Sequence, residues 1–332
     1  MDIATPVCVV LSGGVALGSY QGGVFEVLQA QTGLAVGWVA GSSVGAVNCA
    51  MIAGCAPDKR LDALRTYWLR GSGWNMPTAM APPGGMRHAA NWLSVLQARL
   101  FGSPRHVQAA GPRLTFSSFY DLAPTVDYLR KVVDFGRLNS GELRITVAAT
   151  DLESGDMVLF DSQRDRIGMD HLLASCGFLP EFAPVEIDGR LLGDGGLAAN
   201  APVEPVLDES EGSDATIFVV DLFARDGARP SGLEGALERK NALMFGNQTF
   251  LRLDAYRRLW TRQPRTEPLP TILYLSYRPV EGEAGPEMTF DFSQASAHDR
   301  WTAGRLDMEE ALLRHDAAKA GGEVVTAIRR RR

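Results

Sequence analysis

The chain has 332 residues, 45% of them hydrophobic, with a formal net charge of −6 and a pI near 5.5. This length and apolar content suit one large α/β domain or one domain with an appendage. The acidic balance excludes a global basic field, so no nucleic-acid partner is expected. No apolar run approaches the length of a membrane span, so any membrane contact is expected to be peripheral.

The cysteines and the N-terminus indicate the compartment. The chain contains four cysteines, at Cys8, Cys49, Cys55 and Cys176. They show no metal-ligand spacing and are too few to staple a chain of this length, so we expect reduced thiols and no metal site. Residues 1–6 carry no positive charge, and the apolar run over residues 7–11 is too short for a secretion signal. A cytoplasmic protein is therefore expected.

The first expected elements are a buried strand over residues 6–12 and a helix over residues 19–30. Between them lies the loop Ser12-Gly13-Gly14-Val15-Ala16-Leu17-Gly18, whose backbone N–H groups can converge on an anion. The glycine spacing does not fit a dinucleotide fingerprint, and no lysine occurs before Lys59, which excludes a P-loop. An oxyanion hole or a plain turn remains.

The second strand, over residues 36–41, runs into a helix over residues 43–53 through Gly41-Ser42-Ser43-Val44-Gly45. A serine between two glycines at a strand-to-helix corner has its hydroxyl pushed out of the sheet. The helix N-terminus beside it can stabilise a developing negative charge. Ser43 is therefore a candidate nucleophile, although a cluster of this kind is also common in plain turns.

The middle of the chain is expected to alternate helices and strands. A helix with Asp58 as its N-cap should run to Arg70, and an irregular loop should cover residues 71–87. A helix over residues 89–101 carries four large apolar residues on one stripe, which suits the core, a lid or a lipid-facing surface: Trp92, Val95, Leu96 and Leu100. Further expected elements are a helix over residues 121–133, strands over 143–150 and 157–160, a helix over 169–175 and a hairpin over 185–192.

Asp194 lies in Gly193-Asp194-Gly195-Gly196, where small neighbours let another segment approach its carboxylate. An Asp-Gly turn is the plainer interpretation. A serine nucleophile needs a base, and the five histidines share no signature that marks one of them as that base. A carboxylate could serve if desolvation raised its pKa from about 3.9.

The C-terminal third is expected to contain a helix over residues 235–260, a strand over 271–277 and a closing helix over 293–330. The last residues, Arg329–Arg332, are expected to form a solvated tail, which could also touch an anionic surface. Nothing in the sequence predicts an oligomeric state.

Three blocks in this order, residues 12–18, 41–45 and 194–196, resemble the three motif blocks of the patatin-like phospholipases. Residues 149–155 and 183–190 resemble connecting blocks of the same family, so the resemblance spans about residues 6–225. The tail is similar to the extension carried by one bacterial subgroup of the family. Its matching segments are residues 245–249 and 290–293 and the pair Arg300-Trp301.

The resemblance implies a three-layer α/β fold, in which helices flank a mostly parallel central sheet. It implies a catalytic domain over residues 1–225 and a mainly helical extension, packed on the core, over residues 226–332. Family members hydrolyse acyl esters of lipids without metal or cofactor, so a lipid or another acyl ester is the expected substrate.

The same resemblance implies site residues. Ser43 would be the nucleophile and Asp194 the base of a catalytic dyad. The N–H groups around Gly13 and Gly14, with Val15 beside them, would form the oxyanion hole. Five further glycines would support the motifs: Gly18, Gly41, Gly45, Gly195 and Gly196.

Three positions depart from the family pattern. Val15 stands where a third glycine is usual, Leu17 where many members have Arg or Lys, and Cys176-Gly177 in a segment usually rich in small Ser and Ala. A β-branched residue resists positive φ. Val15 therefore leaves open a catalytically impaired protein that binds lipid or a partner. The other alternative is a Ser-His-Asp α/β-hydrolase that uses His298.

Overall fold

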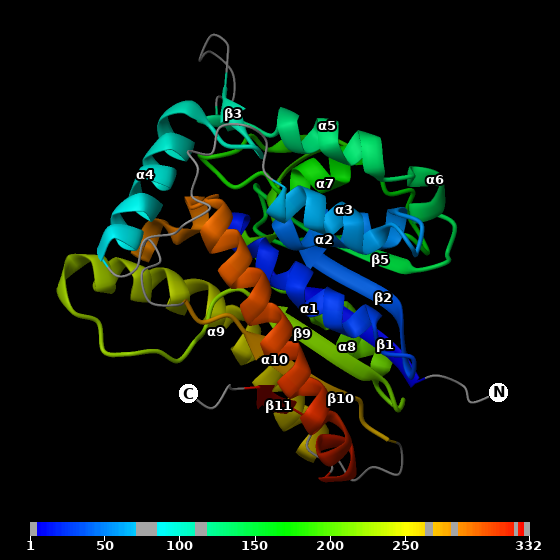
Figure 1. Ribbon diagram of the computed structural model, residues 1–332. Helices are drawn as coiled ribbons and strands as arrows, with labels where there is room; N and C mark the ends of the chain where they lie inside the picture. Colours follow the sequence, from blue (N-terminus) through cyan, green and yellow to red (C-terminus); the bar gives the residue numbers. More distant parts are fainter. Residues whose placement is uncertain are drawn as a thin grey trace.

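The computed structural model describes residues 5–70, 85–109, 118–262, 268–279, 285–321 and 325–328. Its centre is a nine-stranded sheet in the order β11-β10-β9-β1-β2-β5-β8-β7, with β6 paired to β5 (Figure 1). The strands of this sheet are β1 (Thr5–Leu11), β2 (Leu34–Ser42), β5 (Arg144–Asp151), β6 (Met157–Asp161), β7 (Val185–Ile187), β8 (Arg190–Asp194), β9 (Thr216–Asp221), β10 (Thr271–Ser276) and β11 (Val325–Ile328). A separate pair is formed by β3 (Val107–Gln108) and β4 (Tyr120–Asp121).

The α-helices cover both faces of this sheet. They are α1 (Ser19–Gln29), α2 (Val44–Gly54), α3 (Arg60–Leu69), α4 (Gly85–Phe101), α5 (Ala123–Val132), α6 (Phe135–Leu138), α7 (Met169–Ser175), α8 (Glu204–Ser210), α9 (Gly232–Arg262) and α10 (Gln294–Gly321). Three short 3-10 helices are η1 (Val15–Gly18), η2 (Gly195–Leu197) and η3 (Gly285–Phe290).

The sheet is mostly parallel, as predicted. β1 pairs in parallel with β2 and β9, and the parallel run continues through β10 to β11. On the other side β5 joins β2 in parallel and then pairs antiparallel with β6 and β8. The predicted hairpins, β5 with β6 and β7 with β8, are both present.

Alternating side chains build a core on each face of the sheet. In β1, Val7, Val9 and Leu11 belong to one cluster, whereas Cys8 and Val10 belong to the other. The first cluster is covered by α1, α2, α3, α5, α7 and α10, and the second by α8 and α9 (Figure 1). Apolar residues on both sides of the same strands explain the continuous hydrophobic runs of the sequence. The predicted three-layer architecture is thus confirmed.

Helix α10, from the C-terminal third, packs directly against α1, which follows the glycine-rich loop (Figure 1). A β-carbon at Gly23 would lie 1.9 Å from the carbonyl oxygen of Trp301, and one at Gly304 would lie 2.0 Å from that of Tyr20. The backbones of α1 and α10 are therefore in direct contact at these two glycines, which have no side chains to keep the helices apart. The Trp301 indole N–H also donates to Glu26 at 2.7 Å.

Two expected helix starts differ from the structure. α3 begins at Arg60 with Lys59 at its N-cap and no side-chain cap, so the prediction of Asp58 as the N-cap is wrong. α4 begins at Gly85, so residues 85–87 are helical and not part of a loop. The remainder of that expected loop, residues 71–84, lies outside the described residues.

The end of the chain also differs from expectation. The closing helix ends at Gly321, and residues 325–328 form β11, which pairs with β10. A free sheet edge can add a strand where local sequence alone suggests helix. Helix α8 and strand β9 were not predicted individually, and Arg329–Arg332 lie outside the described residues.

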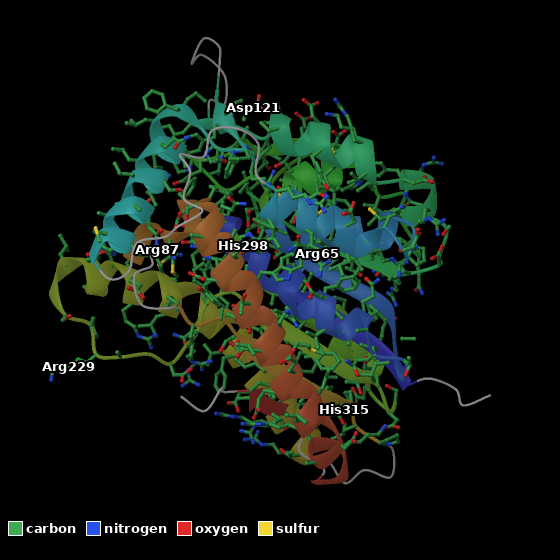
Figure 2. The ribbon with its side chains drawn as sticks, viewed as in Figure 1. Arg65, Arg87, Asp121, Arg229, His298 and His315 are labelled. Carbon is green, nitrogen blue, oxygen red and sulfur yellow. The ribbon has the colours of Figure 1, made fainter. Side chains whose placement is uncertain are left out.

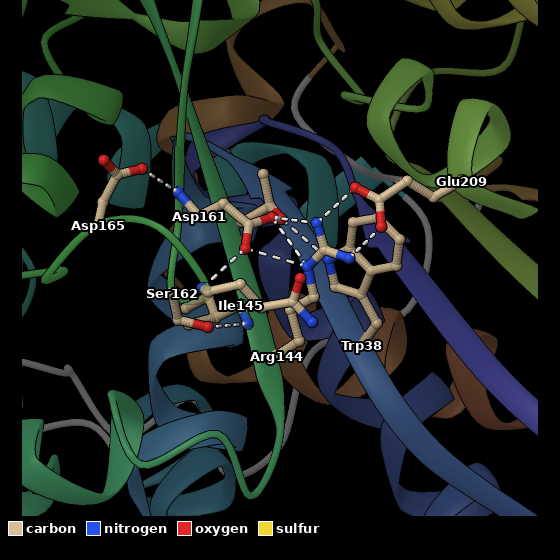
Figure 3. A network of polar contacts seen from close by, with 9 residues as sticks. Trp38, Arg144, Ile145, Asp161, Ser162, Asp165 and Glu209 are labelled. Carbon is tan, nitrogen blue, oxygen red and sulfur yellow. Dashed lines mark hydrogen bonds and ion pairs between the residues drawn. The ribbon is translucent and has the colours of Figure 1, made fainter.

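A charged network on β5 and β6 shows how this fold treats buried charge (Figure 3). Asp161 is fully buried, and each of its carboxylate oxygens lies 3.0 Å from Nε of Arg144. Thr146 donates to Asp161 at 2.6 Å, and Arg144 pairs with Glu209 while its guanidinium stacks 3.6 Å from the Trp38 ring centroid. These partners hold the pKa of Asp161 below its usual range.

All four cysteines are buried, and none of them forms a disulfide. Among the described helices, none combines the length and the apolar content that a segment crossing a bilayer requires. The same ranges contain no group of three or more His, Cys, Asp or Glu side chains arranged to hold a metal ion.

Candidate active site

Three loops from distant parts of the sequence meet at one edge of the central sheet. Ser42, at the end of β2, pairs with Ala148 of β5, and the next residue of β5, Ala149, pairs with Asp194 at the end of β8. The loop after β1 closes the third side, because a β-carbon at Gly13 would lie 3.0 Å from the β-carbon of Ser43. The register of the sheet thus brings together the predicted serine, aspartate and glycine loop.

Ser43 occupies a strained corner between β2 and α2. Its φ of 55° and ψ of −128° lie in a region that residues with a β-carbon avoid, at a cost of about 1–3 kcal/mol. The corner is held by hydrogen bonds: the Ser43 N–H donates to Oγ of Ser175 at 2.9 Å, and the Ser43 carbonyl accepts from Ala46 at 2.9 Å. This strained strand-to-helix turn projects the hydroxyl from the sheet edge, as at a nucleophile elbow.

Asp194 presents a buried carboxylate to this corner. Its side chain is only 2% exposed, and its Oδ1 accepts from the N–H of Gly196 at 2.7 Å. Its Oδ2 is buried with no hydrogen-bond partner among the described residues, although the Ser43 hydroxyl is close enough to favour the charged form. Burial is the larger effect and raises the pKa of Asp194 to about 7. Such a carboxyl group is poised to accept a proton near neutral pH.

The glycine loop offers N–H groups, but not from every predicted residue. The Gly13 N–H donates to the carbonyl of Asn200 at 2.9 Å and so contributes to the packing of the loop, while its role as an oxyanion donor stays a prediction. Within the described ranges the N–H groups of Gly14 and Val15 have no acceptor. Nor does that of Val44 in the first turn of α2. Val15 itself has a φ of 51°, the positive value that its β-branched side chain disfavours.

The five supporting glycines allow the loops to approach one another. A β-carbon at Gly195 would lie 2.2 Å from Oγ of Ser42, and one at Gly45 would lie 2.2 Å from the carbonyl oxygen of Leu11. The corresponding nearest distances are 2.5 Å at Gly41, 2.6 Å at Gly18 and 2.9 Å at Gly196. A β-carbon at Gly45 or Gly195 would push neighbouring segments apart, whereas one at Gly41, Gly18 or Gly196 would meet the Gly45 backbone, the Trp68 ring or the Asp194 carboxylate.

Residues of the C-terminal third support the site, and sequence reasoning did not identify them. Gln248 of α9 accepts from the Asn200 N–H at 3.0 Å and donates to the Gly196 carbonyl at 3.3 Å. Arg300 of α10 is fully buried and donates to the carbonyl of Ala16 at 3.1 Å. The resemblance of residues 245–249 and of Arg300-Trp301 to family segments was the one signal that pointed to these positions.

Ser43 borders a cavity with about 430 Å³ of empty space. Its apolar and aromatic lining includes Val15, Val44, Val47, Leu122, Phe182 and Phe292. A mostly apolar cavity with a few convergent polar groups is typical of a site for a small amphipathic ligand. Cys176 also borders the cavity, and burial raises the pKa of its thiol well above the usual range, so it stays uncharged. Leu17 is fully buried and does not line the cavity.

One histidine borders the cavity, and it is His106. Its Nδ1 lies 2.9 Å from Oγ of Ser103 and its Nε2 lies 3.1 Å from the carbonyl oxygen of Ala98, so both ring nitrogens are engaged. Burial lowers the pKa of His106 to about 4, which keeps the ring neutral. His298, the histidine of the α/β-hydrolase alternative, is exposed on α10 and does not line the cavity (Figure 2).

Helix α4 covers the aromatic wall of this cavity and leaves its opposite face open. Val95 packs with Tyr120, Phe182 and Phe290, and Trp92 packs against the same cluster. Four apolar residues on the outer face are exposed by 53–67%: Met86, Leu93, Leu96 and Leu100. The predicted single stripe is therefore divided, because Trp92 and Val95 face inward while Leu96 and Leu100 face outward.

Residues 9–207 match the family of patatin-like phospholipases, a match over more than half of the chain. VipD from Legionella pneumophila is 13% identical with a TM-score of 0.38, and the match covers 91% of this chain and 67% of that one. A chain of the heterodimeric ExoU–SpcU complex from the type III secretion system of Pseudomonas aeruginosa is 15% identical with a TM-score of 0.34. That match covers 91% of this chain, which spans about half (52%) of the other. No curated protein sequence matches.

The strain at Val15 leads to a stability prediction. Val15→Gly should raise the free energy of unfolding by about 1 kcal/mol, because relief of about 1–3 kcal/mol of strain exceeds the extra chain entropy of glycine, about 0.5–1 kcal/mol. Val15→Ala, which keeps a β-carbon without the branch, should fall between the two. Urea unfolding of the three proteins measures the difference, and a less stable glycine variant would contradict it.

Proposed function

The chain belongs to the patatin-like phospholipase family, and we propose that it is a serine acyl-ester hydrolase for lipid-like substrates. Ser43 would act as the nucleophile and Asp194 as its base. One observation carries the proposal: a buried carboxylate oxygen without a hydrogen-bond partner lies beside a serine hydroxyl that borders an apolar cavity. An unpaired buried carboxylate destabilises a fold, so its presence beside a strained serine favours a catalytic role.

In the acylation step, Asp194 takes the proton from the Ser43 hydroxyl while the oxygen attacks the ester carbonyl. The carbonyl oxygen becomes an oxyanion, which the N–H groups of Gly14, Val15 and Val44 can stabilise at the start of α2. The proton on Asp194 then passes to the departing alcohol. In deacylation, water attacks the acyl carbonyl while Asp194 accepts a proton from that water. The bond between the acyl carbon and Oγ of Ser43 then breaks, the proton on Asp194 returns to Oγ, and the fatty acid leaves.

A second candidate function rests on Val15. Its positive φ requires a backbone that valine disfavours, and a poorly held oxyanion donor can cost about 3 kcal/mol of barrier. A protein that binds acyl lipids in the same cavity with little turnover is therefore the competing proposal. The hydrolase is favoured, because Val15 has kept its N–H free of any acceptor among the described residues.

The outer face of α4 supports a peripheral contact with lipid surfaces. Met86, Leu93, Leu96 and Leu100 are exposed on a helix whose inner face packs on residues of the cavity wall. Insertion of these side chains at an interface would bring the wall of the cavity to the lipid, and each leucine would contribute up to about 1.5–3 kcal/mol. We propose this face as the membrane contact of the protein.

Loss of Ser43 should abolish covalent labelling. Ser43→Ala should neither react with a fluorophosphonate probe nor turn over p-nitrophenyl esters, and Asp194→Asn should lower turnover by about 10²–10⁴ because the base is lost. Ser42→Ala is the matched control, since the Ser42 hydroxyl donates to the carbonyl of Ala199 at 3.0 Å and Ser42 is not among the residues that line the cavity. Probe labelling in gel and ester hydrolysis measure both effects.

A folded wild type that binds acyl lipid but neither labels nor turns over ester would support the binding-only role. Equal loss of labelling in Ser42→Ala and Ser43→Ala would instead indicate that the corner is perturbed as a whole.

The raised pKa of Asp194 sets the pH dependence of turnover. Because the carboxylate is the active form, kcat/KM should rise as pH increases and level off above about 7. The rate is measured on a short, uncharged p-nitrophenyl ester across the range of about pH 5 to about pH 9. A rate already constant at about pH 5 would mean that Asp194 titrates like an exposed carboxyl group.

The α4 proposal predicts weaker vesicle binding when its outer face becomes polar. A triple variant should have a partition coefficient onto phospholipid vesicles about tenfold lower or more. It replaces Leu93, Leu96 and Leu100 together by Gln. Leu313→Gln is the matched control, because Leu313 is 80% exposed near the far end of α10. Vesicle sedimentation gives the partition coefficient, and an equal loss with Leu313→Gln would remove α4 from the interface.

A further inference from the structure

Arg105 is the one permanently charged side chain on the described lining of the cavity at Ser43. The other polar lining groups are uncharged at neutral pH: Ser43 and Thr125 are hydroxyls, and burial keeps the His106 ring neutral and the Cys176 thiol protonated. The electrostatic field inside the cavity is therefore positive on the side of Arg105. In an apolar enclosure such a charge acts strongly on any anion that enters.

The guanidinium group of Arg105 has no carboxylate within ion-pair distance among the described residues. Its Cζ lies 4.0 Å from the ring centroid of Tyr67, and its Nη1 donates to the carbonyl of Pro104 at 3.3 Å. Arginine carries five N–H donors, so most of them remain available to a ligand.

Several other partly buried arginines have carboxylate partners, whereas Arg239 donates to the backbone carbonyls of Ala224 and Arg225. Arg144 pairs with Asp161 and Glu209, and Arg99 pairs with Glu181 and Glu287. A guanidinium group shielded from water without an anion is costly unless a ligand supplies that anion. Arg105 therefore differs from these paired arginines in the way expected of a ligand-binding residue.

An acidic side chain, that of Asp291, shares a second cavity with Arg105 but already has other partners. Arg105 also borders a second cavity of about 350 Å³ of empty space, and Asp291 lines that cavity too. Both carboxylate oxygens of Asp291 accept hydrogen bonds, one from the N–H of Ser293 at 2.9 Å and one from the hydroxyl of Ser296 at 2.6 Å. The cation within ion-pair distance of Asp291 among the described residues is Arg300, whose Nη2 lies 3.8 Å from Oδ2, so Asp291 pairs with Arg300 and not with Arg105.

The backbone of Arg105 is fixed at both of its polar groups. Its N–H donates to Oγ of Ser103 at 3.1 Å, and its carbonyl accepts from Oγ1 of Thr125 at 2.9 Å. The Thr125 hydroxyl is in turn 2.9 Å from the Tyr67 hydroxyl, on the ring over which the guanidinium lies. Arg105 is thus presented to the cavity from a rigid support, which lowers the entropy lost on binding.

From these observations we propose that Arg105 binds an oxyanion group, of the phosphate type, carried by the same molecule as the ester that Ser43 attacks. The inference rests on the proposed hydrolase function and names its substrate class as anionic acyl esters. The planar fork of arginine suits the oxygens of phosphate. The glycine loop contributes no cation, since Leu17 is uncharged and fully buried, so selection for charge depends on Arg105.

The test compares two esters that differ only in the presence of a phosphate group: a 1-acylglycerol and the 1-acylglycerol 3-phosphate with the same acyl chain. Wild type should prefer the phosphorylated ester in kcat/KM by about tenfold or more, mainly through a lower KM. Arg105→Gln should lower that ratio of the two kcat/KM values by about tenfold, and Arg105→Lys should retain part of it. Arg65 lies on α3 (Figure 2) and pairs with Glu26. Arg65→Gln therefore removes one positive charge away from the cavity, as a matched control, and should leave the ratio unchanged.

Inorganic phosphate distinguishes a headgroup site from a site for free anions. Competition by phosphate at submillimolar concentration in wild type, lost in Arg105→Gln, would mean that a free anion suffices, which would overturn the requirement for a tethered ester. A ratio near one in wild type, or equal in wild type and Arg105→Gln, would also overturn the inference.

Two readouts separate failure of this inference from failure of the hydrolase proposal. Fluorophosphonate labelling of Ser43 in every variant reports whether the catalytic corner is assembled. If wild type neither labels nor turns over, calorimetric binding of the two lipids replaces kinetics. A preference for the phosphorylated lipid that disappears in Arg105→Gln would then support the anion site in a protein that binds and does not hydrolyse.

Discussion

The candidate site depends on the closeness with which three backbone loops approach one another at one edge of the sheet. The approach is possible because the residues at the contacts lack β-carbons: at Gly195 and at Gly45 a β-carbon would stand 2.2 Å from a neighbouring oxygen. The sheet register then carries the serine, the aspartate and the oxyanion donors to one point. Chemistry at this point is thus a product of packing between segments about 150 residues apart.

The same arrangement places residues that lower the stability of the fold where the reaction is proposed to occur. Ser43 and Val15 hold positive φ values, and one oxygen of Asp194 is buried without a partner. Elsewhere the protein treats buried charge differently, because Asp161 receives Arg144 and a threonine hydroxyl. The two apolar cores on either face of a nine-stranded sheet supply the stabilisation that offsets these local costs.

The local sequence pattern predicted those features of the fold that depend on residues close together in the chain. The strand-loop-helix units around Ser12–Gly18 and Gly41–Gly45, and the hairpins of β5 to β8, follow from hydrophobic period and glycine placement. Ser43 and Asp194, the predicted nucleophile and base, stood out because small residues flank both of them. Asn200, Gln248 and Arg105 did not stand out, since each acts through contacts that no local pattern encodes.

The errors of prediction have the same origin. Leu96 and Leu100 share a helical stripe with Trp92, yet the tertiary setting of α4 covers the edge of the stripe with Trp92 and Val95 and leaves the edge with Leu96 and Leu100 exposed. The residues of β11 were expected to continue a helix and became a strand once β10 offered an edge. In both cases the deciding partner is distant in sequence.

The supports that α9 and α10 give to the catalytic loops have a consequence for synthesis of the protein. Ser43 and Asp194 are made early, whereas Gln248 and Arg300, which hold the carbonyls of Gly196 and Ala16, are made late. A nascent chain that has left the ribosome only as far as residue 225 carries the reactive groups without these two braces. The order of translation therefore leaves the loops of Ser43 and Asp194 without these two hydrogen bonds until nearly the whole polypeptide has been made.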